Sequence, residues 1–139
     1  MFESMEKAFE LNSVNVAEYS PLTLAYIGDC VYELIIRTRL VMQKNAPVNK
    51  LNKKASDLAK AGTQAAIIEK VMDTLTGDEV AVYKRGRNAH SYTRAKNATA
   101  SDYRKATGFE ALIGYLYLQK KFDRIMEIVK TGFEEVMAL

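Results

Sequence analysis

Hydrophobic residues recur at intervals of three and four along almost the whole chain, which is the spacing of one buried face of an α-helix. The clearest example follows Ser20 and Pro21, an N-cap residue and a proline at the first helical position, and its apolar stripe continues to about Val41. No segment shows the strict alternation of apolar and polar residues that is typical of a half-buried strand. The pattern therefore predicts an all-α fold with about seven helices.

Capping and turn signals divide the rest of the chain into further helices. Thr76 and Glu79 have the spacing of a capping box, in which each side chain bonds the backbone N–H of the other. Residues 86–100 show weak periodicity and many small polar side chains, so we expect a loop there. The other expected helices are 47–62, 63–75 with Thr63 as its cap, 76–84, one from about 101 and one after 123.

The composition fits a single domain spanning residues 1–139, since 48% of the residues are hydrophobic and 27% are charged. Cys30 is the only cysteine and His90 the only histidine, so neither an intramolecular disulfide nor a zinc cluster is expected. No apolar run approaches the roughly 18 residues that span a bilayer. The acidic N-terminus, with Glu3 and Glu6, is unlike a targeting peptide. We therefore expect a cytoplasmic protein with no membrane association.

The net charge of +3 hides an uneven distribution of charge along the chain. Segments 37–60 and 84–105 hold 14 of the 20 lysines and arginines but only 2 of the 17 acidic residues. Such segregation favours a basic face for a polyanion such as nucleic acid. Two solvated helix faces, or a module that binds an acidic protein, are the alternatives. The residues expected to contact nucleic acid are Lys50, Lys53, Lys54, Lys84, Arg85, Arg87, Arg94 and Lys96.

Two acidic residues, Asp29 and Glu110, each interrupt an apolar run within a predicted helix. Burying a carboxylate is costly unless it is paired, hydrogen-bonded or bound to a metal. Two such acids on separate helices can converge on a hard cation such as Mg²⁺, which prefers oxygen ligands. The spacing also allows a plainer interpretation. Asp29 would then share a solvated stripe with Glu33 and Arg37, and Glu110 would pair with Arg104 or a lysine.

Four short motifs in this chain resemble, in order and spacing, those of the ribonuclease III family. They are Leu24-Ala25-Tyr26-Ile27-Gly28-Asp29, Lys53-Lys54, Lys84-Arg85-Gly86-Arg87-Asn88-Ala89 and Phe109-Glu110-Ala111-Leu112-Ile113-Gly114. The resemblance covers roughly residues 15–135 and is closer to the Mini-ribonuclease III branch, whose members lack a double-stranded-RNA-binding domain.

The resemblance implies an all-helical, homodimeric endonuclease that uses Mg²⁺, with Mn²⁺ as a substitute ion. It further implies hydrolysis of double-stranded RNA to 5′-phosphate ends and a role in the maturation of the 23S (large-subunit) ribosomal RNA precursor. A non-catalytic RNA-binding protein with the same fold is the alternative, and the presence of both Asp29 and Glu110 argues against it.

Carried over by position, the resemblance assigns Asp29 and Glu110 as the catalytic residues and metal ligands. Two of the four usual metal-cluster acids are absent here. Longer members of the family carry acids at three positions that are occupied in this chain by Leu22, Ala25 and Thr107.

The neighbourhood of these acids yields three further expectations. Glu33 is a candidate substitute ligand, because helical side chains lean toward the N-terminus and would bring it over the turn that holds Asp29. His90 is expected to contact phosphate or solvent rather than to act as a general acid. The apolar helix that contains Tyr26, Val31 and Tyr32 is expected to contribute to a homodimer contact.

Overall fold

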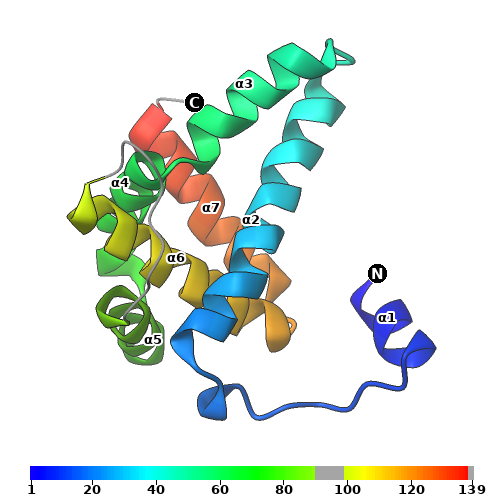
Figure 1. The fold of residues 1–139 in the computed structure, drawn as a ribbon, viewed down its shortest axis with the longest axis vertical. Helices are drawn as coiled ribbons and strands as arrows, with labels where there is room; N and C mark the ends of the chain where they lie inside the picture. The colour runs from blue at the N-terminus through cyan, green and yellow to red at the C-terminus, as the bar shows by residue number, and fades with distance from the viewer. Residues whose placement is uncertain (90–98, 138–139) are drawn as a thin grey trace.

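A computed structural model describes residues 1–89 and 99–137, and all regular structure within these ranges is helical. The predicted all-α class is therefore confirmed (Figure 1). None of the described helices combines the length and the apolar character that crossing a bilayer requires. The elements are α1 (Phe2–Ala8), η1 (Val16–Glu18), α2 (Pro21–Gln43), α3 (Val48–Ala59), α4 (Ala61–Val71), η2 (Met72–Thr74), α5 (Gly77–Asn88), α6 (Ala100–Leu118) and α7 (Phe122–Met137).

The capping signals predicted from the sequence are present at two helix starts. At α2, the Ser20 hydroxyl accepts a hydrogen bond from the Thr23 N–H at 3.2 Å, and Pro21 occupies the first helical position. At α5, the Thr76 N–H donates to Glu79 Oε1 at 2.9 Å, while the Glu79 N–H donates to Thr76 Oγ1 at 3.2 Å. These bonds satisfy backbone donors that have no partner inside a helix.

Some helix boundaries differ from those predicted. Helix α4 begins at Ala61 rather than after a Thr63 cap, because the Thr63 hydroxyl donates back to the carbonyl of Asp57 at 2.6 Å. Helix α5 continues through Asn88, so the first residues of the predicted 86–100 loop are helical. The rest of that predicted loop, residues 90–98, lies outside the described residues. Helix α1 was not predicted.

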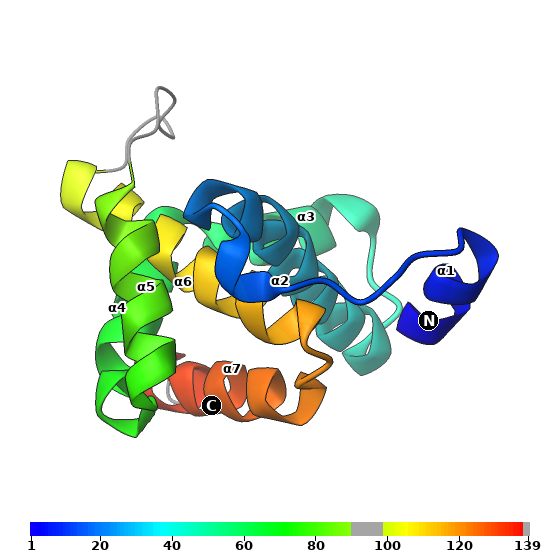
Figure 2. The ribbon, with the colours of Figure 1, turned by 90° about the horizontal axis from the view of Figure 1, so that it is seen from below.

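Helix α6 is the central element of the fold. Seen from below, it lies between α7 on one side and α2 on the other (Figure 2). Residues 106–109 and 111–114 are all buried, so α6 is covered on several sides rather than along one stripe. Its largest buried side chains pack with those of neighbouring helices into the main core, among them Tyr32, Ile36, Ile67, Ile68, Phe109, Leu112, Ile113, Leu116, Ile125 and Ile128.

Two glycines allow α2 and α6 to approach each other at backbone contact distance. A Cβ atom added at Gly28 would lie 1.8 Å from the carbonyl oxygen of Glu110, and one added at Gly114 would lie 2.0 Å from that of Leu24. Neither position can hold any other side chain without movement of one helix, because the atoms met are backbone atoms. The glycines therefore determine how closely the two helices cross.

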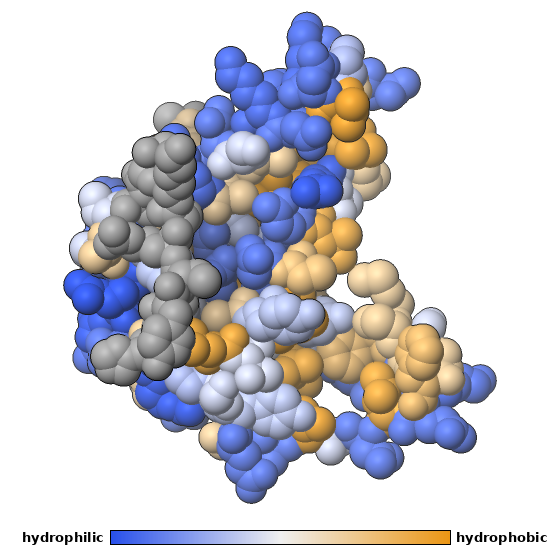
Figure 3. Space-filling model, viewed as in Figure 1, coloured by the Kyte–Doolittle hydropathy of each residue, from blue (hydrophilic) through white to orange (hydrophobic). Residues whose placement is uncertain are grey.

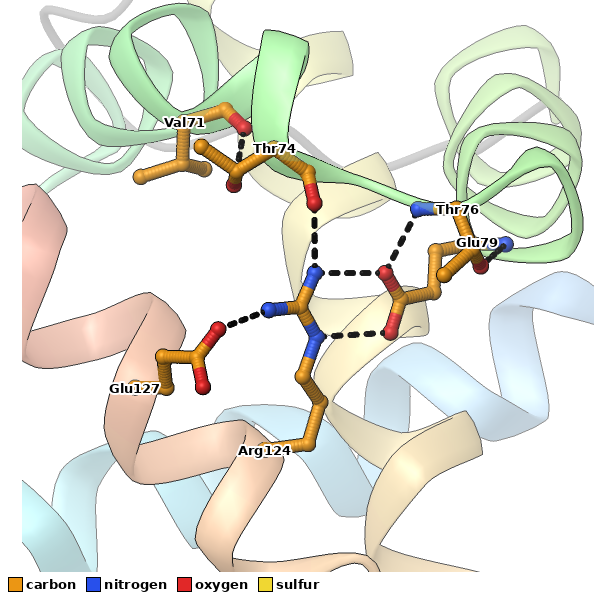
Figure 4. A network of polar contacts seen from close by, with 6 residues as sticks. All are labelled: Val71, Thr74, Thr76, Glu79, Arg124 and Glu127. Carbon is orange, nitrogen blue, oxygen red and sulfur yellow. Dashed lines mark hydrogen bonds and ion pairs between the residues drawn. The ribbon is translucent and has the colours of Figure 1, made fainter.

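Helix α5 is held against the rest of the fold at both of its ends. Near its C-terminus, a Cβ atom at Gly86 would lie 2.9 Å from the Cα of Gly108 in α6. At its N-terminus, the guanidinium of Arg124 in α7 donates to both carboxylate oxygens of Glu79, at 2.9 and 2.8 Å (Figure 4). The same guanidinium donates to the Thr74 carbonyl at 2.8 Å and pairs with a further acid, Glu127. Glu79 is buried, and the Arg124 hydrogen bonds hold its pKa below the usual range.

The glycine crossing generates a stability prediction. Gly28→Ala should destabilise the protein by about 3 kcal/mol or more, because the added methyl group would overlap the Glu110 carbonyl. Gly77→Ala is the matched control, since its Cβ would meet no atom within 4 Å. Urea unfolding of the two variants measures the difference. Equal midpoints for Gly28→Ala and wild type would contradict the proposed role of the contact.

Candidate active site

The glycine crossing brings Asp29 of α2 and Glu110 of α6 together. Gly28, the residue before Asp29, packs against the backbone of Glu110. The neighbouring Asp29 carboxyl is near enough to raise the pKa of the Glu110 carboxyl. Asp29 is exposed and Glu110 is partly buried, so the pair is open to solvent on the Asp29 side.

Negative charge at this pair is not compensated by the described part of the protein. Burial first, and the Asp29 carboxyl second, raise the pKa of Glu110 to about 8. None of the lysines and arginines in the described ranges forms an ion pair with either acid. Asp29 is exposed, as the plainer interpretation expected, but the ion pairs that it assigned to Asp29 and Glu110 do not form among the described residues. Arg37 pairs with Glu33 at 3.2 Å, and Arg104 is exposed without an ion pair to Glu110.

A buried amide completes the surroundings of Glu110. The Gln64 side chain of α4 donates to Glu110 Oε2 at 3.5 Å, which is long for a hydrogen bond, and this contact lowers the pKa of the carboxyl against the larger opposing effects. Sequence analysis missed Gln64. A polar residue at the start of the apolar run of a predicted helix was the available signal, but neither charge nor a motif distinguished it.

The donor set fits a hard divalent cation. Two carboxyl groups offer oxygen ligands, and a cation would offset both the burial and the repulsion that raise the pKa of Glu110. No cluster of three or more acidic, histidine or cysteine ligands occurs within residues 1–89 and 99–137. A cation held by Asp29 and Glu110 would have two carboxylate ligands from the described residues, which would leave other coordination positions for water and substrate oxygens.

Two of the three positions at which the resemblance places further acids are buried here, while the third, Leu22, is 39% exposed. Ala25 and Thr107 are both buried, and the Thr107 hydroxyl donates to the carbonyl of Tyr103 at 3.0 Å. Glu33 extends toward Arg37 in its ion pair rather than back over Asp29. Its charge nevertheless contributes to the raised pKa of Glu110.

The described residues that were expected to contact nucleic acid lie on two helices, α3 and α5. Lys50, Lys53 and Lys54 are exposed on α3, over which hydrophilic side chains gather at the top of Figure 3. At the end of α5, Lys84 and Arg85 are exposed. Arg87, Arg104 and Lys105 line a hollow of about 390 Å³ between α5 and α6, which was not predicted. Arg94, Lys96 and His90, to which the sequence analysis assigned contacts, lie outside the described residues.

A model of the Ribonuclease III domain matches residues 22–121, a span that includes both acids and both basic helices. The chain belongs to the ribonuclease III family. It is 48% identical over 122 residues to Mini-ribonuclease 3 of Clostridium tetani, covering 87% of this chain and 81% of that protein. It is 43% identical over 136 residues to Mini-ribonuclease 3 of a Thermoanaerobacter species, covering 98% and 96% of the two chains.

A solved structure agrees with this assignment. A crystal structure of a Fusobacterium nucleatum protein superposes with a TM-score of 0.76 at 32% identity, covering 85% of this chain and 94% of the other. Ribonuclease III proteins are endoribonucleases that act on double-stranded RNA and generally depend on divalent metal ions. Membership in the family, and the Mini-ribonuclease 3 relatives within it, identify this chain as an endoribonuclease.

Of the three residues expected at a dimer contact, two are turned inward. Val31 and Tyr32 are buried in the core, so that expectation is wrong for them in the described structure. Tyr26 is 83% exposed and remains available at the surface of α2, three residues before Asp29.

The electrostatics of Glu110 generate a pH prediction for the metal-free protein. The folded pKa of about 8 lies above the unfolded value of about 4.3, so the folded state binds the proton more tightly. The contribution of this carboxyl to the free energy of unfolding is therefore fully present below pH 4 and is lost as the pH rises through 8. Glu110→Gln removes this loss, so its free energy of unfolding at pH 9 should exceed that of wild type by about 1–2 kcal/mol.

Urea unfolding at pH 5 and pH 9 in the presence of a chelator measures the effect. Glu134→Gln, at an exposed position of α7, is the control and should follow wild type. Parallel curves for wild type and Glu110→Gln at both pH values would show that burial of this carboxyl costs the fold nothing.

Proposed function

We propose that this ribonuclease III protein cleaves double-stranded RNA with Mg²⁺ held by Asp29 and Glu110, and that Mn²⁺ can substitute. The observation that carries the proposal is the carboxyl pair, which no cation of the described ranges neutralises, together with two helices that carry exposed basic residues. The repulsion between the two carboxyl groups works against folding. A non-catalytic RNA-binding protein would gain nothing in return for that cost.

The two acids have different tasks in this proposal. A divalent metal held by both acids would supply activation of water and stabilisation of charge on the phosphate and the leaving oxygen. Glu110, fixed within the central helix, holds the inner side of the site. Asp29, which is exposed, forms the side that faces the substrate. Neither acid needs to transfer a proton.

The basic helices suit the shape of the substrate. A-form RNA duplexes are recognised mainly through phosphates and 2′-hydroxyl groups across the shallow minor groove. In our proposal the α3 lysines contact one part of the duplex, and Lys84, Arg85 and Arg87 of α5 contact another. Arg94 and Lys96 are assigned to the same face on sequence grounds alone.

We further propose a symmetric homodimer, since cleavage of both strands calls for two sites related by a two-fold axis. The exposed Tyr26 near Asp29 supports a contact along α2. Sedimentation of a stable monomer that still cuts both strands would exclude it. The resemblance to Mini-ribonuclease 3 supports products with 5′-phosphate ends and a role in the maturation of the 23S ribosomal RNA precursor in the cytoplasm.

Removing the exposed ligand tests the catalytic assignment. Asp29→Asn should lower the cleavage rate of a duplex RNA by at least about 10³-fold while duplex affinity stays within a factor of about three, because metal chemistry is lost and the basic helices are intact. Asp123→Asn, at an exposed acid of α7, is the control and should cleave normally. A folded, fully active Asp29→Asn enzyme would exclude Asp29 as a ligand.

Salt dependence tests the RNA-binding face. Neutralising Arg85 and Arg87 together to Gln should weaken binding to duplexes of any sequence and flatten the slope of log K against log salt by about one to two units. The Arg85 side chain also donates to the Tyr19 carbonyl at 3.2 Å, so circular dichroism must confirm the fold. Neutralising the exposed Lys70 and Lys130 is the matched control. An unchanged slope in the arginine variant would show that Arg85 and Arg87 do not contact the RNA phosphates.

A further inference from the structure

Gln64 is a buried polar side chain beside the proposed metal site. It lies in the first turns of α4 and is only 3% exposed. Its amide nitrogen donates to the carbonyl of Ala59 at 2.8 Å and approaches Glu110 Oε2 at 3.5 Å. Its oxygen, Oε1, is buried and has no hydrogen-bond partner among the described residues.

The orientation of this amide follows from its neighbours. The carbonyl of Ala59, 2.8 Å away, can only accept, so the opposite orientation of the amide would place oxygen against oxygen there. The orientation that serves this carbonyl leaves Oε1 unsatisfied, which is unfavourable in a buried position. Leucine or methionine would fill the same space without leaving a buried polar atom unsatisfied, so filling space does not explain a glutamine here.

Gln64 is one of three side chains that bind the last carbonyls of α3. The Thr63 hydroxyl donates to Asp57 at 2.6 Å, and the Tyr32 hydroxyl donates to Leu58 at 2.7 Å. Gln64 makes the third contact of this set, to Ala59. Of the three, Gln64 is the one with a hydrogen bond to Glu110, so it alone joins the end of α3 directly to the carboxyl pair.

We propose that Gln64 is a positioning residue, which holds the Glu110 carboxyl in the orientation that binds metal by anchoring it to the end of α3. The proposal rests on the proposed function, because it assumes that Asp29 and Glu110 bind the metal. Groups that orient metal ligands from behind typically change metal affinity by about 10–100-fold when they are removed.

The test is titration of the folded, full-length protein with Mg²⁺ alone by isothermal calorimetry. Gln64→Met keeps the length of the side chain and removes both polar atoms, and it should bind Mg²⁺ about 10–100-fold more weakly than wild type. Thr63→Val is the matched control. It removes a neighbouring bond to the same helix end without touching Glu110, so its Mg²⁺ affinity should stay within twofold. On duplex RNA at fixed Mg²⁺, Gln64→Met should lower kcat with little change in KM.

Wild-type affinity in Gln64→Met, or an equal loss in Thr63→Val, would overturn the proposal. If Gln64→Met does not fold, the side-chain amide resonances of wild-type Gln64 decide. Mg²⁺ should shift them and leave those of the exposed Gln43 unchanged, and unmoved Gln64 resonances would overturn the proposal. Asp29→Asn and Glu110→Gln separate the two ideas. If both still cleave, the proposed function fails. If both lose Mg²⁺ binding while Gln64→Met keeps it, only the role of Gln64 fails.

Discussion

Backbone contact between α2 and α6 is the constraint on which the rest of this structure depends. Gly28 and Gly114 bring the two helices together without intervening side chains, and both the core and the acidic pair form around that crossing. The contact explains why Asp29 and Glu110, about 80 residues apart in the chain, share one site.

Glu79 and Glu110, one buried and one partly buried, have opposite effects on the stability of this fold. Glu79 is fully paired by the Arg124 guanidinium, and its pKa is lowered, so its charge contributes to the stability of the folded state. Glu110 has an acid for its neighbour, and its pKa is raised, so its charge works against the folded state. An uncompensated carboxyl inside a packed helix is typical of a binding site, where the missing charge comes from a ligand.

The parts of the structure that local signals govern were predicted well. The helix starts at Ser20 and Thr76 follow from side chains that bond the nearest backbone groups, and the acidic pair follows from its apolar neighbours. The errors arise where distant contacts decide. Weak periodicity predicted a loop from residue 86, yet α5 continues through Asn88, and Gly86 packs closely against Gly108 of α6. Gln64 acquires its meaning only from Glu110, 46 residues further along the chain.

The bonds that hold the end of α3 have a consequence for the reach of the protein. Side chains from α2 and α4 bind three successive carbonyls there, and the other end of α3 continues into the short connection from α2. Contacts at both ends of α3 thus fix its position relative to the carboxyl pair. Given the proposed contacts, the distance between the α3 lysines and the acids is then constant. A stiff duplex presents phosphates at constant intervals that a constant distance can match. A flexible single strand must first be ordered, at a cost in conformational entropy, before its phosphates reach the same positions.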